Sequence, residues 1–266
     1  MVELLNYNQQ GEGEPLLIIH GLFGSSRNWK TLAGRFAENY RVITPDLRNH
    51  GDSFHAPSMS YAEMAQDIVT LMDTENIASA YFIGHSMGGK VAMKLAHENP
   101  QRVKKLVVAD VAPVAYRHHY DEIIEPVLAL DLSSLRNRRE ADEKLLKSIT
   151  DQRIRLFILQ NLVFNNGVAH WKLNWVAIRD NMAEITGYED ISRWAVSIPS
   201  LFISGENSNY IDDVGRALIT EHFLDVQFNT LAQAGHWLHA EQPDAFYHVV
   251  STFLAADSLP RVNPSK

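Results

Sequence analysis

Ser86 has the clearest chemical context of any residue in this sequence. It stands in Gly84-His85-Ser86-Met87-Gly88, a G-x-S-x-G pattern that follows an apolar run and precedes a helical pattern. In a strand–turn–helix setting, this pattern puts the serine on a tight, strained turn with its hydroxyl projecting at the carboxyl end of a sheet. The flanking glycines fit, because a Cβ atom would clash where strand and helix converge. The pattern predicts a nucleophilic serine rather than an incidental one.

The same stretch also fits part of a phosphate-binding loop. Gly84 to Lys90 spell G-x-x-x-x-G-K after a predicted strand, but Val91 stands where Ser or Thr would bind Mg²⁺. The nucleotide interpretation therefore lacks a required part.

A nucleophilic serine needs a base, which in this arrangement follows the serine along the chain. His236 lies in Ala234-Gly235-His236-Trp237, just after the last predicted strand, where a loop can bring its imidazole to the carboxyl edge of the sheet. His239 is the nearest rival, and we expect it on the surface of the helix that follows. His236 is the predicted base.

A carbonyl attacked by Ser86 becomes an oxyanion, which backbone N–H groups can stabilise. Met87, the residue after the nucleophile, can supply one donor. The second is expected from His20-Gly21-Leu22-Phe23-Gly24, which directly follows a long apolar run. Leu22 is the predicted donor there, with Phe23 as the alternative.

To meet in one site, these residues must lie at strand ends that the fold brings together. The chain alternates apolar runs with helical patterns. Continuous apolar runs are typical of parallel strands covered by helices on both faces. Such an alternation predicts an α/β fold with a mostly parallel, doubly wound sheet. The predicted strands are 16–19, 41–44, 80–83, 105–108 and 200–203, with 226–231 at an edge, and the predicted helices are 28–38, 60–75, 87–98, 212–222 and 243–256.

The interval 113–198 breaks this alternation, because it shows helical periodicity and no clear strand. We expect it to form a helical cap inserted in a core made of 1–112 and 199–266. The helical patterns within it are 122–130, 140–148, 153–164 and 175–185.

Several segments together resemble the α/β-hydrolase superfamily, over nearly the whole chain. They are His20-Gly21, the segment 45–53, the serine turn and Gly235-His236-Trp237. Five longer sequence motifs are similar to those of the YbfF-type bacterial esterases, which are related to the abhydrolase-domain-11 proteins. These motifs are HGLFGS at 20–25, RNHG at 48–51, HSMGGK at 85–90, DVAP at 110–113 and GENS at 205–208. The resemblance implies a cofactor-free serine hydrolase of acyl esters or acyl-thioesters, with a helical cap over the site.

The sequence leaves more than one candidate for the acid that orients His236. Superfamily relatives usually carry it at the fourth position of G-x-x-D after the strand expected at 200–203, and here that position is Ser208. A neutral hydroxyl cannot stabilise an imidazolium by charge. Asp110 follows the preceding predicted strand, where some branches of the superfamily carry the acid, so it is the predicted acid. The alternatives are Glu206, Asp212 and Asp213.

Substrate-binding residues are less defined by sequence. Aromatic side chains of the insertion can line an acyl pocket or merely pack the insertion on the core. The candidates are Phe23, His85, Phe157, Phe164, Trp171 and Trp237. His118, His119 and Asp121 form one short cluster without a spaced further ligand, so no metal site is predicted.

Composition excludes several functional classes. The net charge of −8 disfavours nucleic acid as a partner, and the absence of cysteine excludes thiolate chemistry. No apolar run is long enough to span a membrane, and the first residues lack a signal-peptide pattern, so we expect a cytoplasmic protein. We expect a small acyl ester or acyl-CoA-like substrate and a monomer or homodimer. Carbon–carbon bond hydrolysis, perhydrolysis and a non-catalytic ligand-binding role remain alternative functions.

Overall fold

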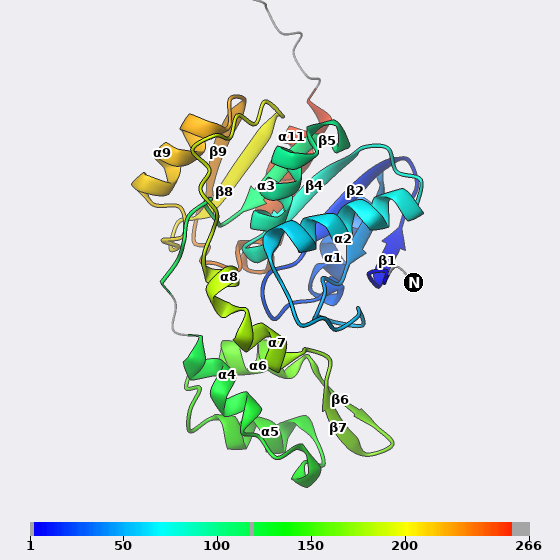
Figure 1. Ribbon diagram of the computed structural model, residues 1–266, viewed down its shortest axis with the longest axis vertical. Helices are drawn as coiled ribbons and strands as arrows, with labels where there is room; N and C mark the ends of the chain where they lie inside the picture. Colours follow the sequence, from blue (N-terminus) through cyan, green and yellow to red (C-terminus); the bar gives the residue numbers. More distant parts are fainter. Residues whose placement is uncertain (1–2, 118–119, 257–266) are drawn as a thin grey trace, which may run out of the picture.

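A seven-stranded sheet organises the computed structural model, which describes residues 3–117 and 120–256 (Figure 1). The strand order is β1-β3-β2-β4-β5-β8-β9, and every pairing except β1–β3 is parallel. This confirms the predicted mostly parallel sheet, and β9 lies at an edge as expected. The strands are β1 (Tyr7–Gln10), β2 (Glu14–Ile19), β3 (Tyr40–Pro45), β4 (Ala80–His85), β5 (Val103–Ala109), β8 (Ser200–Gly205) and β9 (Val226–Leu231).

Two hydrophobic cores lie on opposite faces of this sheet. In β2, Leu17 and Ile19 belong to one core, and Leu16 and Ile18 belong to the other. Because both faces are buried, the strands are apolar without alternation. The first core packs against α2 (Tyr61–Thr74), α3 (Met87–Glu98) and α9 (Asp213–His222), and the second against α1 (Lys30–Phe36) and α11 (Pro243–Ala255). Shorter helices are η1 (Ser26–Trp29), η2 (Pro100–Arg102) and α10 (Leu238–Glu241).

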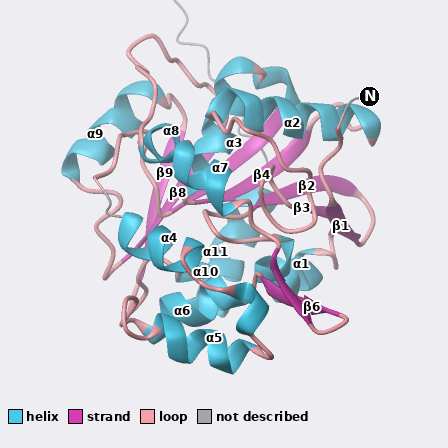
Figure 2. Cartoon of the chain, turned by 60° about the horizontal axis from the view of Figure 1, so that its bottom comes forward, coloured by secondary structure: helices cyan, strands magenta, loops and turns pink. Residues whose placement is uncertain are grey.

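The elements between β5 and β8 lie together below the sheet in Figure 1 and come forward in Figure 2. They are mostly helical: α4 (Asp121–Leu128), η3 (Leu132–Ser134), α5 (Arg138–Leu145), α6 (Gln152–Leu159), α7 (Trp175–Asp180) and α8 (Met182–Thr186).

The expectation that this interval holds no strand was wrong. β6 (Leu162–Asn165) and β7 (Val168–Trp171) form an antiparallel hairpin, so the helix predicted over 153–164 ends early. The turn consists of Asn166 and Gly167, both with positive φ. An Asn-Gly turn of this kind is typical of a two-residue hairpin and was the available sequence signal.

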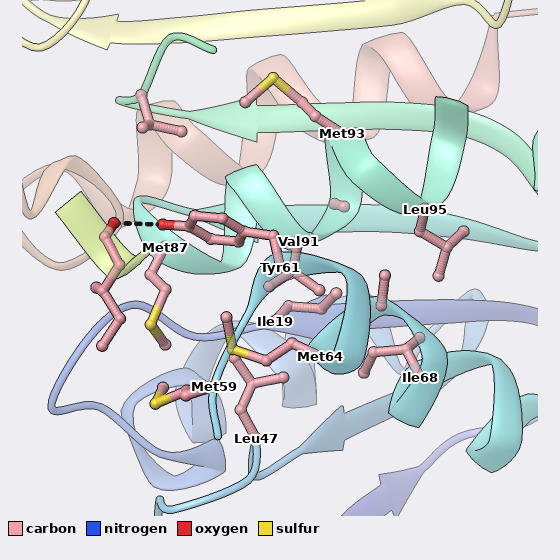
Figure 3. Packing of buried hydrophobic residues seen from close by; sticks show 14 of the residues in the cluster. Ile19, Leu47, Met59, Tyr61, Met64, Ile68, Met87, Val91, Met93 and Leu95 are labelled. Carbon is pink, nitrogen blue, oxygen red and sulfur yellow. Dashed lines mark hydrogen bonds between the residues drawn. The ribbon is translucent and has the colours of Figure 1, made fainter. Parts of the chain in front are cut away.

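Hydrogen bonds fasten the inserted elements to the core. The Tyr61 hydroxyl on α2 donates to the Ile185 carbonyl on α8 at 2.6 Å, beside the buried methionines of the first core (Figure 3). Lys90 Nζ on α3 donates to the Gly187 carbonyl at 2.7 Å. Because α3 starts directly after Ser86, the Lys90 bond ties the insertion to the helix that follows the predicted nucleophile.

Candidate active site

Ser86 lies at the junction of β4 and α3 with φ 52° and ψ −120°. This is a strained conformation for a residue with a side chain, and such strain persists only where the surroundings impose it. The two flanking glycines explain how the surroundings impose this conformation on Ser86. A Cβ atom at Gly84 would lie 2.3 Å from the Gly88 carbonyl oxygen, and one at Gly88 would lie 2.4 Å from the His20 carbonyl oxygen. The close approach of three backbone segments therefore fixes the turn.

The structure brings Ser86, His236 and Asp110 together from three different loops. The Ser86 hydroxyl donates to His236 Nε2 at 3.1 Å, and His236 Nδ1–H donates to Asp110 Oδ2 at 2.7 Å. Asp110 directly follows β5, and His236 lies between β9 and α10, so both are at carboxyl ends of strands. This geometry lets the imidazole accept the serine proton while the carboxylate holds its orientation.

Asp110 is fully buried and has further hydrogen-bond donors. The Gly205 N–H donates to its Oδ1 at 3.2 Å, and the Ser208 hydroxyl donates to its Oδ2. Ser208, at the position where superfamily relatives are expected to carry the acid, thus contacts Asp110, the predicted acid, which follows the neighbouring strand.

The other carboxylates weighed from the sequence have different partners in the described chain. Glu206 accepts from the Gln233 N–H at 2.7 Å. Asp212 caps α9 by accepting from the Gly215 N–H at 2.7 Å. Asp213 is exposed in the first turn of that helix. None of the three is bonded to His236, whose Nδ1 contacts Asp110.

Tyr210 is a site residue that the sequence analysis missed. Its ring stacks on the His236 imidazole, with centroids 3.8 Å apart and planes 15° apart. It follows the loop of Ser208, whose hydroxyl oxygen accepts from the Tyr210 N–H at 3.3 Å. No local motif marks this residue, because its loop meets His236 only in the fold.

The loop after β2 lies against the serine turn. A Cβ atom at Gly21 would be 3.3 Å from Ser86 Cβ, and no acceptor for the Leu22 N–H occurs in the described ranges. Met87 is the first residue of α3, where helical N–H groups lack intrahelical partners. Leu22, Ser86 and Met87 share a small hollow of about 20 Å³, which has room for one oxygen atom. The alternative donor, the Phe23 N–H, is directed at His50 Nε2 at 3.2 Å.

Two fully buried histidines brace this loop. His20 Nδ1–H donates to the Gly21 carbonyl at 2.8 Å, and His20 Nε2 accepts from the Leu47 N–H at 3.0 Å. His50 Nδ1–H donates to the Arg48 carbonyl at 3.0 Å. Burial lowers the pKa of both, that of His50 to about 3, so each is neutral and uses one nitrogen as donor and the other as acceptor.

We expect the free energy of unfolding to decrease as the pH falls from about 7 to about 5. His50 has an ordinary pKa of 6.5 and a folded pKa of about 3. In that window the unfolded chain binds a proton at His50 that the folded chain excludes. The contribution of neutral His50 to the free energy of unfolding is therefore fully present above the ordinary pKa and is lost progressively below it. The slope is about 1 kcal/mol per pH unit for one such group.

Urea unfolding at several pH values measures this slope. His50→Gln retains an acceptor and a donor but cannot titrate, so its stability should depend less steeply on pH. The matched substitution of exposed His248 to Gln is the control. An equal slope in wild type and His50→Gln would contradict the assignment.

A hollow of about 250 Å³ opens beside Ser86 and His236. The inserted elements contribute apolar side chains from α4 and α6, and the core contributes aromatic and histidine side chains. Four of the predicted substrate-binding residues line it, namely Phe23, His85, Phe157 and Trp237. Tyr120, Ile123 and Ile154 line it as well, and the sequence analysis did not name them.

The structure does not bring Phe164 and Trp171 to this hollow. Both lie on the β6–β7 hairpin and line a separate, more open hollow with Lys172. The expectation that they lie beside Ser86 is therefore corrected, because α6 ends at Leu159 and residues 162–171 form the hairpin instead of continuing the helix.

His239 was expected on a helix surface, and this was wrong. It is 6% exposed, its ring stacks on Trp29, and it lines the hollow. The cluster considered as a metal site, His118 and His119 with Asp121, has both histidines outside the described residues. Within residues 3–117 and 120–256, no group of three or more histidines and carboxylates could hold a metal ion.

Comparisons with known proteins identify the family of this chain. A family model described as alpha/beta hydrolase fold matches residues 14–243. The chain is 36% identical to the Escherichia coli esterase YbfF over 246 residues, which cover 92% of this chain and 94% of that protein. It is 36% identical to the mouse sn-1-specific diacylglycerol lipase ABHD11 over 248 residues, covering 90% of this chain and 80% of that protein.

A solved structure of a marine microorganism esterase superimposes with a TM-score of 0.91 at 38% identity, covering 95% of this chain and all of the other. Within the part of the chain that the structure describes, no helix is long and apolar enough to cross a membrane.

Proposed function

Since this chain belongs to the alpha/beta hydrolase family and is an esterase/lipase-type member by homology, we propose that it hydrolyses carboxylic esters through an acyl-enzyme on Ser86. One observation carries this proposal. A continuous hydrogen-bond chain from Ser86 through His236 to Asp110 lies at the wall of an apolar hollow.

In the first half of the proposed reaction, Ser86 Oγ attacks the acyl carbonyl carbon and its proton passes to His236 Nε2. The carbonyl oxygen becomes an oxyanion, which the Leu22 and Met87 N–H groups stabilise. When the tetrahedral intermediate collapses, the bond to the leaving group breaks and His236 donates its proton to the leaving oxygen. The acyl group stays on Ser86.

In the second half, a water molecule takes the place of the leaving group. His236 removes its proton, the resulting hydroxide attacks the acyl carbon, and the proton returns to Ser86 as the carboxylic acid leaves. Asp110 remains a carboxylate throughout and stabilises the imidazolium that forms in each half.

The apolar side chains of α4 and α6 support a role of residues 113–198 as a cap that holds the acyl chain. Ile123, Ile154 and Phe157 come from this segment, and together with Phe23 they can surround an acyl chain. A hollow of about 250 Å³ is small for a ligand site, since such sites run from roughly 300 to 1,000 Å³. The proposed substrates are therefore small esters or thioesters with short acyl chains.

A kinetic series on nitrophenyl esters and on acyl-CoA thioesters, from acetyl to palmitoyl, tests this function. Each methylene that enters the hollow contributes about 0.8 kcal/mol, so kcat/KM should rise about fourfold per methylene until the hollow is full and then fall. The relative values for esters and thioesters decide between the two leaving groups. If no member of either series is hydrolysed above the buffer rate, the proposed function is wrong.

A further inference from the structure

Two histidines in the wall of the hollow have no part in the proposed reaction. His85 is 4% exposed and His239 is 6% exposed, and both line the hollow beside Ser86. Their ring centroids are 4.5 Å apart. Polar groups buried to this extent normally have hydrogen-bond partners, so unpaired nitrogens here indicate a ligand.

His85 offers an acceptor. Burial, with the neighbouring imidazoles, holds the pKa of His85 well below its usual range, so the ring is neutral. Its Nε2 lies 2.8 Å from the His236 carbonyl oxygen, which can only accept, so Nε2 carries the proton. Nδ1 therefore presents a lone pair, and no donor to it occurs among the residues that the structure describes.

His239 offers a donor. Burial lowers its pKa to about 3, so this ring is also neutral. Its Nδ1 is buried without a hydrogen-bond partner in the described chain, and the ring stacks on Trp29 with centroids 4.3 Å apart. An unpaired buried lone pair is better tolerated than an unpaired buried N–H group. We therefore assign the proton to Nε2, the other ring nitrogen, for which no hydrogen bond to the described residues occurs and which is not enclosed as Nδ1 is.

The position of this pair relative to His236 identifies the part of the substrate that it meets. His236 donates its proton to the leaving oxygen, so the leaving group lies on the His236 side of Ser86. The centroid of the His85 ring is 4.8 Å from that of His236, and His239 lies next to His85. We infer from this closeness to His236 that the pair meets the leaving group.

We propose that His85 and His239 form a subsite for the leaving group that selects esters whose alcohol carries a second hydroxyl. One hydroxyl can donate to His85 Nδ1 and accept from His239 Nε2–H, which gives these two nitrogens a partner at once and leaves His239 Nδ1 as an unpaired lone pair. A methyl group satisfies neither, and an ether oxygen can only accept. The inference rests on the proposed ester hydrolysis and adds the chemistry of its leaving group.

The wild-type enzyme provides the first test, with three butanoate esters of similar size. They are the 2-hydroxyethyl, 2-methoxyethyl and propyl esters. We expect kcat/KM for the 2-hydroxyethyl ester to exceed that for each of the other two by about tenfold or more, because a site with buried polar groups rejects analogues that leave those groups unpaired. Equal values for the three esters would overturn the subsite.

His239→Phe is the second test, because phenylalanine keeps a flat ring against Trp29 and removes both nitrogens. The tenfold ratio should fall to about one in this variant, and His239→Gln, which retains an N–H donor, should restore part of it. The matched control is His97→Phe. His97 stacks on Trp194 in the same manner, with centroids 4.4 Å apart, but does not line the hollow, so the ratio should not change.

The outcomes separate the two proposals. If none of the esters is hydrolysed, the proposed function fails. If all are hydrolysed and the preference for the hydroxyl survives in a folded His239→Phe variant, ester hydrolysis stands and the subsite is wrong. If His239→Phe does not fold, the wild-type ratio decides.

Discussion

Ser86→Ala should lower kcat by about 10⁶-fold and leave the fold intact. The variant removes only Oγ, the atom that forms the proposed acyl-enzyme. Its backbone keeps the strain that Ser86 already bears at φ 52°, because alanine also has a Cβ atom. Steady-state kinetics on the best ester of the series measures the loss, and thermal unfolding checks the fold.

Ser204→Ala is a suitable control for this substitution. Ser204 lies on β8, where its hydroxyl bonds to the Thr230 hydroxyl at 3.0 Å, and it does not line the hollow. Its kcat should stay within about threefold of wild type. More than a few per cent of wild-type activity in purified Ser86→Ala, with contaminating esterases excluded, would remove Ser86 as the nucleophile.

Asp110→Asn should lower kcat by about 10⁴-fold, mainly by selecting the wrong histidine tautomer. Asparagine has nearly the same shape and tolerates the positive φ of 53° at this position. However, the Gly205 N–H donates to the Oδ1 position and holds the amide oxygen of the asparagine there, so its NH₂ group faces His236. That group donates to Nδ1, and the imidazole proton moves to Nε2. Nε2 can then no longer accept the proton of Ser86.

Asp212→Asn and Asp213→Asn are the matched controls. Asp212 caps α9 and Asp213 is exposed, so both variants should change kcat less than about tenfold. Asp212→Asn should also cost little stability, because asparagine caps helices nearly as well as aspartate. If either variant loses activity as severely as Asp110→Asn, the acid assignment is in error.

The local sequence was sufficient to predict the serine turn and most strands of the sheet. Gly84 and Gly88 mark a point where backbones approach within contact distance, and that constraint is visible in the pattern itself. The buried strands are apolar on both faces, so their existence follows from composition alone. Chain order then predicted which loops meet, and Ser86, Asp110 and His236 do lie within hydrogen-bond distance. Their catalytic roles remain predictions.

What the sequence did not predict depends on contacts between distant segments. β1 is short and polar and is a strand only because it pairs with β3. His239 follows His236 by three residues and was expected on a helix surface, yet Trp29 of η1, some 200 residues earlier in the chain, stacks on its ring. Likewise, nothing near Tyr210 signals that its ring stacks on His236.

For the same reason, only some of the predicted substrate-binding residues line the hollow beside Ser86. Phe157 on α6 faces the hollow, whereas Phe164 and Trp171 follow the hairpin away from it. A continuous helix through 153–164 would have kept Phe157 and Phe164, which are about two turns apart, on the same face. The Asn166-Gly167 turn prevents this, so a two-residue signal changed the position of two candidate residues.

Covalent labelling with a fluorophosphonate, followed by peptide mass spectrometry, tests the central claim most directly. The reagent phosphonylates a serine that a neighbouring histidine activates. We expect a single adduct on the peptide that contains Ser86, no adduct in Ser86→Ala, and much slower labelling in Asp110→Asn. Folded wild-type protein that remains unlabelled, or an adduct on any residue other than Ser86, would contradict the proposed acyl-enzyme mechanism.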